Sequence, residues 1–418
     1  MIKKRHNLKI TLVFIIAMLL VGLYSCNSNY LDDFEDYDID TDGDGIFDSQ
    51  EVLNGTDKNN PCDPSHDVQY SSFNSSNLVW LAGDCDGDGL INGDELSVGN
   101  NPYGDPIIKN FAVPEFLPNL SQLKLFKGNM SDLQLNDNVY EYDMSTPLFT
   151  DYSYKLRVVA VPDGTQMMYK GDNLLDFPDN TILAKTFYYL NDERDSSLGK
   201  KCIETRVLIK KNGEWLVRNY FWNEDQTDAV LDDDAHGLQV DWIDDLGVSR
   251  IVDYVVPSNT MCVQCHELNE KIVPIGPKAR AMNFNHNGQN ILQFFKDNNM
   301  LAEAPEVSQI PTLPDWSDTS LTLEERARAY FDVNCAHCHQ KGGSYNRDFG
   351  DKFYFTFETP FTESNIYVER TQISDRMGTA IPGYFMPLIG TSIKHDEGID
   401  LINTYLDSLE QEGKSKAN

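Results

Sequence analysis

The sequence predicts a multidomain chain that combines a small module of repeated acidic loops, a β-rich domain with a sandwich or barrel-like sheet, and an α-helical region. Three observations support this prediction. Two twelve-residue acidic loops lie before residue 100, strand-like runs separated by turn residues fill the middle, and two Cys-x-x-Cys-His motifs lie after residue 260. The expected segments are a signal peptide at 1–25, a tether at 26–37, the loop module at 38–106, the β-rich domain at 107–257, a first motif segment at 258–318, a helical domain with the second motif at 319–412, and a tail at 413–418.

The composition is that of a folded, strongly acidic protein. Of the 418 residues, 40% are apolar and 24% are charged, which is enough apolar sequence for a full core. The net charge of −32 argues against nucleic acid as a partner, because a phosphate backbone would be repelled. Acidity of this degree is compatible with hard cations, a basic protein partner or simply a solvated surface.

The first 25 residues have the pattern of a signal peptide. A cationic stretch at 3–9 precedes an apolar run at 10–23, which is short for a membrane span. The run ends in Leu23-Tyr-Ser-Cys26, which resembles a bacterial lipobox with Cys26 as the lipidated residue. An uncleaved anchor is the alternative. Either reading implies an exported protein held in the bacterial cell envelope, at the outer membrane or the cell surface.

The loop module holds two copies of one acidic pattern. Residues 40–51 and 84–95 match the twelve-residue calcium loop, with oxygen ligands at positions 1, 3, 5 and 9, a carbonyl at 7 and a glutamate at 12. Glycine at position 6 permits the sharp turn that brings these oxygens around one ion. The candidate calcium ligands are Asp40, Asp42, Asp44, Ile46, Asp48 and Glu51 in the first loop, and Asp84, Asp86, Asp88, Leu90, Asn92 and Glu95 in the second.

Residues 38–105 resemble the thrombospondin type 3 repeats of bacterial surface proteins, through these loops and the segment 52–64. No long helix precedes the first loop, so an ordinary EF-hand pair is not expected. The resemblance implies about two calcium ions and a calcium-rigidified spacer, with affinities of about 10⁻⁴–10⁻³ M. The sequence cannot fix a pairing among Cys62, Cys85 and Cys202. We favour Cys62–Cys85, because both lie in this module, and expect Cys202 to be free or buried.

The middle of the chain has the alternation and turn signals of β-structure. Two strand-like runs between Val207 and Trp222 meet at Asn212-Gly213, which predicts a hairpin. Turn signals such as Pro162-Asp-Gly164 separate further candidate strands. These strands are expected at 155–161, 166–169, 182–190, 238–243 and 248–256, and together they favour a sandwich or a barrel-like sheet.

Both Cys-x-x-Cys-His motifs have the form of a c-type haem attachment site. Two thiols three positions apart can each add to one vinyl group of a single porphyrin, and the next histidine then lies under the iron as an axial ligand. We therefore expect two haem c groups, with covalent attachment at Cys262 and Cys265 and at Cys335 and Cys338, and iron ligation by His266 and His339. A structural zinc knuckle, a redox dithiol and a plain disulfide are the alternatives.

The region of the second motif resembles a class I cytochrome c domain. Thr322 and Glu325 form a capping-box pattern that opens a helix ending at Asn334, and a second amphipathic helix is expected from about His395 to Glu410. Between them lies Met386, followed by proline. The resemblance implies that the Met386 sulfur is the distal iron ligand.

The first motif is less complete, because a strand-like run rather than an amphipathic helix precedes it. Residues 275–277 resemble the loop whose proline carbonyl receives the ring N–H of the axial histidine. Met282, His286 and Met300 are candidates for the sixth ligand, and an open sixth position is a further possibility.

Residues 120–412 as a whole are similar to a family of bacterial dihaem c-type cytochromes of unknown function. The similarity rests on the segments 146–155, 256–258, 262–266, 274–277 and 326–339. We therefore expect an electron-transfer cytochrome rather than an enzyme, with a redox partner that the sequence does not identify. The alternatives are a haem enzyme with an open first iron, such as a peroxidase-like reductase or a dehydrogenase subunit, and a surface-binding protein that uses the β-rich domain.

Overall fold

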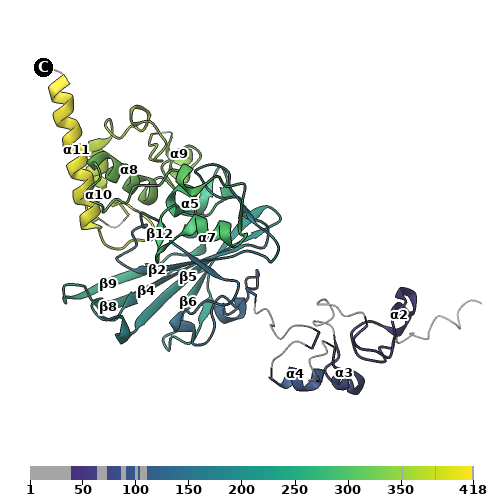
Figure 1. Cartoon of the computed structure of the whole chain (residues 1–418). Helices are drawn as coiled ribbons and strands as arrows, with labels where there is room; N and C mark the ends of the chain where they lie inside the picture. Colours follow the sequence, from purple (N-terminus) through teal and green to yellow (C-terminus); the bar gives the residue numbers. More distant parts are fainter. Residues whose placement is uncertain are drawn as a thin grey trace, which may run out of the picture. The chain divides into compact units, whose positions relative to one another are not determined.

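The computed structural model describes residues 39–63, 73–85, 91–98, 102–103, 111–350, 352–381 and 383–416. It contains two compact units, which divide between Ile108 and Lys109 and are both drawn in Figure 1. The expected signal peptide, the tether and the lipidation site Cys26 lie outside the described residues. Within the described ranges, no helix is both long and apolar enough to cross a membrane.

The first unit is built around one aromatic side chain and one disulfide. Trp80 is fully buried, stacks on Phe73 at 4.1 Å and donates a hydrogen bond from Nε1 to the hydroxyl of Tyr103 at 2.5 Å. The expected disulfide between Cys62 and Cys85 is present. Closing this loop stabilises the unit by about 3 kcal/mol in the chain-entropy model. The helices of this unit are α2 (Asp48–Asn54), α3 (Leu78–Ala82) and α4 (Asn92–Val98).

The second unit contains a six-stranded sheet in which all neighbouring strands are antiparallel. The expected strand at 182–190 and the expected Asn212-Gly213 hairpin are both confirmed. In spatial order the strands are β1 (Tyr140–Tyr142), β2 (Tyr154–Ala160), β4 (Ile182–Leu190), β5 (Lys200–Lys211), β6 (Glu214–Trp222) and β7 (Ala229–Leu231).

Alternation along the strands gives the sheet two apolar faces. Val159, Leu183 and Val217 face a core that also contains residues from 262 to 310, whereas Val158 and Ala184 face a core formed with residues 120–133. The second core includes two 3-10 helices and the buried free thiol of Cys202. These helices are η2 (Leu120–Leu123) and η3 (Met130–Asp132).

The sandwich or barrel-like sheet expected for residues 107–257 does not form in the described part of the chain. The six-stranded sheet stays open, because helices and loops rather than a second large sheet cover its faces. A separate two-stranded sheet packs against Tyr189 and Ile203 at one end. It consists of β8 (His236–Ile243) and β9 (Ser249–Val256), close to the bounds expected for these strands.

Short elements follow β9 and lie on the Val159 face of the sheet, below the label of α8 in Figure 1. They are α5 (Asn259–His266), β10 (Glu267–Leu268), β11 (Lys271–Ile272), α6 (Ala279–Met282), β12 (Asn285–His286), β13 (Gln289–Asn290), α7 (Ile291–Asp297), β14 (Leu301–Ala302) and η5 (Val307–Gln309). β14 pairs in parallel with β3 (Met167–Met168), the short remainder of the strand expected at 166–169. The 3-10 helix η4 (Ser196–Leu198) precedes β5.

The last part of the unit is helical. Helix α8 (Leu323–Asn334) begins at the capping box of Thr322 and Glu325, as expected from the sequence. It crosses the C-terminal helix at Gly398, where a Cβ atom would lie 2.3 Å from the hydroxyl of Tyr330. The crossing therefore requires glycine at this position. The remaining elements are α9 (Ser344–Phe349), η6 (Phe361–Glu363), α10 (Arg370–Gly378) and α11 (Asp396–Lys416).

Candidate functional site

The second Cys-x-x-Cys-His motif lies immediately after α8. Cys335 caps the helix, and its carbonyl accepts hydrogen bonds from the backbone N–H groups of Cys338 at 3.2 Å and His339 at 3.0 Å. This tight turn follows directly from the helix end, because the carbonyl groups of the last turn have no helical partners. Both thiols and the imidazole line one pocket.

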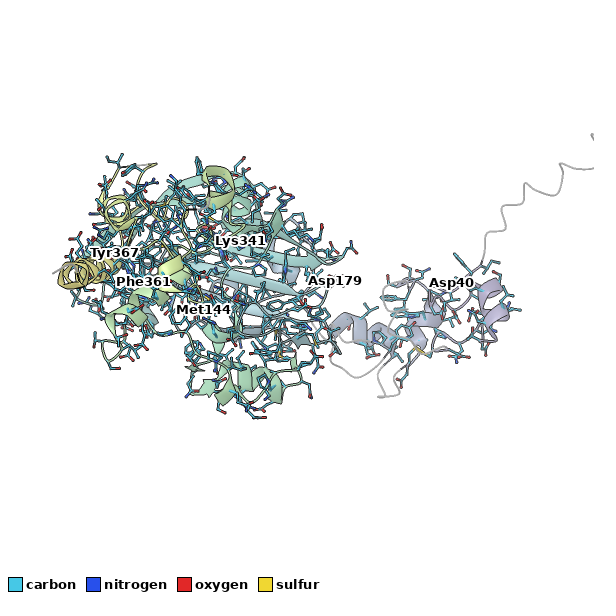
Figure 2. All side chains as sticks on the ribbon, turned by 90° about the horizontal axis from the view of Figure 1, so that it is seen from above. Asp40, Met144, Asp179, Lys341, Phe361 and Tyr367 are labelled. Carbon is cyan, nitrogen blue, oxygen red and sulfur yellow. A yellow bond between two sulfur atoms is a disulfide. The ribbon has the colours of Figure 1, made fainter. Side chains whose placement is uncertain are left out.

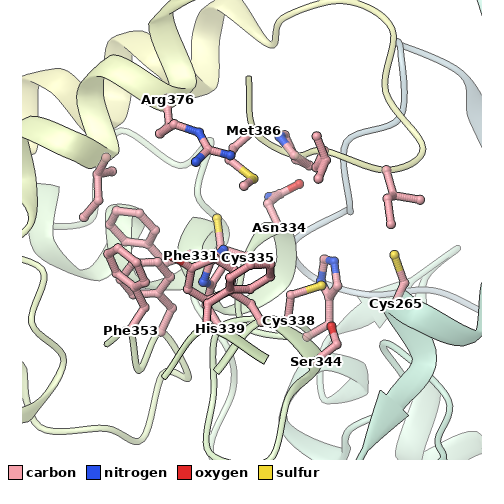
Figure 3. A pocket seen from close by; sticks show the side chains of 18 of the residues that line it. Cys265, Phe331, Asn334, Cys335, Cys338, His339, Ser344, Phe353, Arg376 and Met386 are labelled. Carbon is pink, nitrogen blue, oxygen red and sulfur yellow. The ribbon is translucent and has the colours of Figure 1, made fainter. Parts of the chain in front are cut away.

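That pocket contains about 1000 Å³ of space, including its open mouth. Figure 3 shows Cys335, Cys338 and His339 on one side of it and the thioether of Met386 on the other. Aromatic side chains, among them Phe331 and Phe353, form much of the wall. The structure therefore brings the two thiols, the histidine and the methionine of the sequence prediction into a single apolar cavity.

His339 is held among aromatic rings. Its imidazole lies 4.5 Å from the ring of Tyr345 and 5.1 Å from that of Phe353, centroid to centroid. Burial lowers the pKa of His339 to about 4, so the ring is neutral at neutral pH. Its Nδ1 is buried with no hydrogen-bond partner in the described structure. A neutral imidazole is the form that binds a metal.

The first motif forms the short helix α5, although the sequence before it predicts a strand. The hydroxyl of Ser258 caps it by accepting a hydrogen bond from the Met261 N–H at 3.4 Å. Cys262 and His266 are both buried. His266 Nδ1 donates a hydrogen bond to the Val273 carbonyl at 2.8 Å, and burial lowers the pKa of its ring to about 3. Nε2 is thereby the nitrogen left to bind a metal.

The acceptor for His266 differs from the expected one. The segment 275–277 was expected to supply a proline carbonyl, but the Val273 carbonyl takes this role because β10 and β11 form a tight hairpin directly after His266. The Val273 N–H donates in return to the His266 carbonyl at 2.8 Å. Gly276 instead permits close packing: its φ is 113°, and a Cβ there would meet the sulfur of Met144, labelled in Figure 2.

The two motifs lie side by side, although they are far apart in the sequence. The sulfur atoms of Cys265 and Cys338 and a ring nitrogen of His337 all lie within 4.8 Å of one another. The Cys265 thiol donates a hydrogen bond to Cys338, which lowers the pKa of the Cys338 thiol and raises that of Cys265. Cys265 also lines the pocket of the second motif (Figure 3).

The candidate sixth ligands of the first motif have other surroundings. Met282 and Met300 are buried in the core between the sheet and α7, in the same cluster as Cys262. His286 directs Nε2 at Glu141, 3.1 Å away, and Nδ1 at Asp143, 4.0 Å away. The charged groups that act most strongly on the His266 ring are instead Lys185 and Arg206 of the sheet, both of which lower its pKa.

The first acidic loop is arranged as the sequence predicts for a cation site. Carboxylate oxygens of Asp40, Asp42 and Asp44 lie within 4.8 Å of one another. Glu51 is fully buried, and neither of its carboxylate oxygens has a hydrogen-bond partner among the described residues. Burial, reinforced by neighbouring carboxylates, raises the pKa of Asp42 to about 6 and that of Glu51 to about 7. Buried like charges of this kind favour a bound cation.

The other candidate ligands are less uniform. The Asp48 carboxylate accepts hydrogen bonds from Thr41 and pairs with Lys58 at 3.1 Å, and the Ile46 N–H donates to Asp44 at 2.7 Å. In the second loop Asp86, Asp88 and Leu90 lie outside the described residues. Asp84 is exposed, whereas Asn92 and Glu95 are fully buried, and the Asn92 amide donates to the Trp80 carbonyl at 2.8 Å.

Calcium binding by residues 40–51 should weaken as the pH falls. Raised pKa values mean that the ion-free loop holds protons up to about pH 7 at Glu51 and about pH 6 at Asp42, and calcium must displace them. We expect the apparent Kd to rise by up to about tenfold per pH unit for each proton displaced. Calorimetric titrations at pH 5.5, 6.5 and 7.5 test this. Glu51→Gln should remove the dependence between pH 6.5 and 7.5 and leave that of Asp42 at lower pH. Asp57→Asn should retain the whole dependence, and a native Kd independent of pH would contradict the prediction.

Comparison with known proteins identifies the acidic module and nothing else. Residues 40–61 and 84–102 match the model of the bacterial TSP3 repeat, a calcium-binding repeat. No curated protein and no solved structure matches the chain. The thrombospondin type 3 part of the sequence prediction, and with it calcium binding by the module, is therefore confirmed.

Proposed function

We propose that this protein is an electron-transfer cytochrome with two covalently attached haem c groups, one on Cys262 and Cys265 and one on Cys335 and Cys338. The observation that carries the proposal is the contact between the two motifs, where the sulfurs of Cys265 and Cys338 lie within 4.8 Å. Two groups bound at these thiols are held next to one another, which is what exchange of single electrons requires. Haem iron supplies the one-electron chemistry.

The residues of the second pocket fit such a group. The thiols of Cys335 and Cys338 offer the attachment points, His339 offers a neutral imidazole, and Met386 offers a thioether from the opposite wall. Phe331, Phe353 and their neighbours exclude water, which favours a high reduction potential. Residues positioned in this way would keep the ligands of a bound iron fixed, so that little reorganisation would accompany a change in its oxidation state.

His266 of the first motif is also suited to bind haem iron, because a backbone carbonyl holds its ring in place. The hydrogen bond from His266 Nδ1 to Val273 fixes the ring orientation and leaves Nε2 as the ligand atom. Burial keeps this ring neutral. The haem ligands of both motifs are therefore in the protonation state that iron binding needs.

We further propose that the protein is exported and lipidated at Cys26 in the bacterial cell envelope. The calcium-loaded module, residues 38–106, then acts as a spacer between that anchor and the electron-transfer unit. The signal-peptide pattern at 1–25 and the calcium-binding TSP3 repeats support this arrangement.

Haem content provides the direct test. We expect two haems per chain to stay with the polypeptide through denaturation and acid–acetone extraction, because thioether bonds hold them. Cys262→Ala combined with Cys265→Ala should remove one haem, and Cys202→Ala should remove none, because that thiol is buried on the opposite face of the sheet. Pyridine haemochrome absorbance per mole of protein gives the count.

A bound zinc ion is the outcome that would overturn the proposal. Cys265, His337 and Cys338 offer three ligands to such an ion. Colourless protein with one zinc per chain by elemental analysis, expressed in cells that attach haem c, would assign the motifs to a metal site instead.

A second candidate function is a haem enzyme in which the first iron has an open position. The favouring observation is that the candidate sixth ligands are engaged elsewhere: Met282 and Met300 pack in the apolar core, and His286 directs both ring nitrogens at carboxylates. Carbon monoxide binding by the reduced native protein at one equivalent per chain would favour the enzyme. Six-coordinate, low-spin spectra for both irons would favour the electron carrier.

A further inference from the structure

A line of polar side chains crosses the sheet beneath the first motif. In the antiparallel register, Arg157 on β2 lies opposite Lys185 on β4, which lies opposite Arg206 on β5. Arg206 in turn lies opposite Asn219 on β6. Directly opposed residues of neighbouring strands share one face of the sheet, with Cβ atoms about 4.5–5.5 Å apart. We call these four side chains the polar row.

The polar row is incompletely satisfied by the protein itself. Arg157 is 3% exposed and bonds to Asp143 at 2.5 Å through Nη1, but its Nε and Nη2 have no partner among the described residues. Asn219 is 1% exposed, and neither atom of its side-chain amide has a partner there. A buried donor without a partner costs about 1–3 kcal/mol, so an absent acceptor is the simplest explanation for this arrangement.

The charges around the polar row do not balance. Lys155, two residues before Arg157, lies on the same face, which makes four cations with Lys185 and Arg206. Asp143 pairs with Arg157, and Glu204 holds Arg206 through both carboxylate oxygens.

Neither Lys155 nor Lys185 pairs with a carboxylate anywhere in the described structure. The Lys155 ammonium donates to the Ser153 carbonyl at 2.8 Å, and that of Lys185 lies over the Phe187 ring at 5.9 Å. Burial, together with the neighbouring cations, lowers the pKa of Lys185 to about 7 and that of Lys155 well below its usual value. The face therefore carries an excess of two basic side chains over their carboxylate partners, and a bound anion would hold both lysines protonated.

These basic side chains lie on the face of the sheet that the first motif covers. Helix α5 packs against β6, and its Cys262 lies in the core on the Val159 face, onto which Arg157 also alternates. Arg206 acts electrostatically on both Cys262 and Cys265, and Lys185 acts on His266. The basic side chains and the buried unpartnered donors thus lie on the same face of the sheet as the first motif.

We infer that the polar row, together with Lys155, is the binding site for a dianion held beside the first motif. Two sources have this chemistry. One is the pair of propionate carboxylates of the haem that we propose on Cys262 and Cys265, and this source rests on the proposed function. The other is a small divalent oxyanion from solution, for which sulfate is the probe. Arg157 offers the N–H groups of Nε and Nη2, and Asn219 those of its amide nitrogen, to such oxygens.

The test compares Lys185→Gln and Lys155→Gln with Lys201→Gln in the full holoprotein. Lys201 lies on β5 but is exposed, so its replacement removes the same charge away from the site. Nearby positive charge favours the reduced state of haem. Each of the two site variants should therefore lower the reduced-to-oxidised ratio of the first haem about tenfold at fixed potential, a shift of about 59 mV for one electron.

Added sulfate separates the two sources. If the propionates occupy the site, sulfate at constant ionic strength leaves the native first haem unchanged. If the site takes a free oxyanion, sulfate lowers the native reduced-to-oxidised ratio, and both site variants lose this response. First-haem potentials in Lys185→Gln and Lys155→Gln equal to that of Lys201→Gln, with no sulfate response in the native protein, would overturn the inference.

Loss of the proposed function would be recognised separately. Should the protein contain no covalent haem, thermal unfolding with and without sulfate still tests the polar row. A rise in the Tm of the native protein with sulfate, absent in Lys185→Gln, would support a site for a free oxyanion. Equal Tm values of the native protein with and without sulfate would contradict such a site.

Discussion

Replacing Met386 with alanine should lower the reduction potential of the second proposed haem and open its iron to carbon monoxide. The Met386 sulfur faces the cavity of His339 from the opposite wall, and a neutral thioether favours ferrous over ferric iron (Figure 3). We expect a decrease on the order of 0.1 V or more, a modest part of the roughly 0.8 V that axial ligands span. Spectroscopic redox titration and carbon monoxide binding measure the two effects.

Met377 provides a matched control for this substitution. It lines the same pocket but is 6% exposed and packs in the apolar core with Phe331 and Ile402. Met377→Ala should therefore lower stability by about 2–5 kcal/mol and leave the iron six-coordinate. If Met386→Ala changes neither the potential nor ligand binding, another residue is the distal ligand. If the native protein already binds one carbon monoxide per chain, the first iron has an open position, and the haem-enzyme alternative is favoured.

Local patterns predicted the parts of the fold that depend on neighbouring residues. The capping box of Thr322 and Glu325 set the start of α8, and the Asn212-Gly213 turn set the β5–β6 hairpin. The calcium loops and the Cys62–Cys85 disulfide could likewise be predicted from the sequence, because each is confined to one short module. In each case the determining contacts lie within a few tens of residues.

Contacts between distant strands could not be predicted in this way. Arg157, Lys185 and Arg206 each look like ordinary polar positions in alternating strands, and only the register places them in one line. The same limit explains the incorrect sandwich: alternation cannot reveal whether helices or a second sheet cover a face. His266 is a smaller example, since its acceptor depends on a hairpin that returns Val273 to it.

Removing the carboxylate of Asp332 should destabilise the second unit by about 3 kcal/mol, the low end for a buried ion pair that loses one partner. Asp332 lies on α8 just before the second motif and is 2% exposed. Both of its oxygens accept from the Lys278 ammonium, at 3.0 and 3.1 Å, and one also accepts from the Phe357 N–H at 3.0 Å. Lys278 follows the first motif, so this pair joins the segments that carry the two motifs.

Urea unfolding of the holoprotein tests the prediction with Asp332→Asn. The substituted amide can still accept from Phe357 but leaves the partly buried Lys278 ammonium, 26% exposed, without a counter-charge. Lys278→Met in the same chain should recover part of the loss, because both charges are then absent. Asp137→Asn is the control, since its pair with Lys127 is about half exposed and worth less than about 1 kcal/mol. A loss for Asp332→Asn no larger than for this control would mean that apolar packing alone keeps the two motifs together.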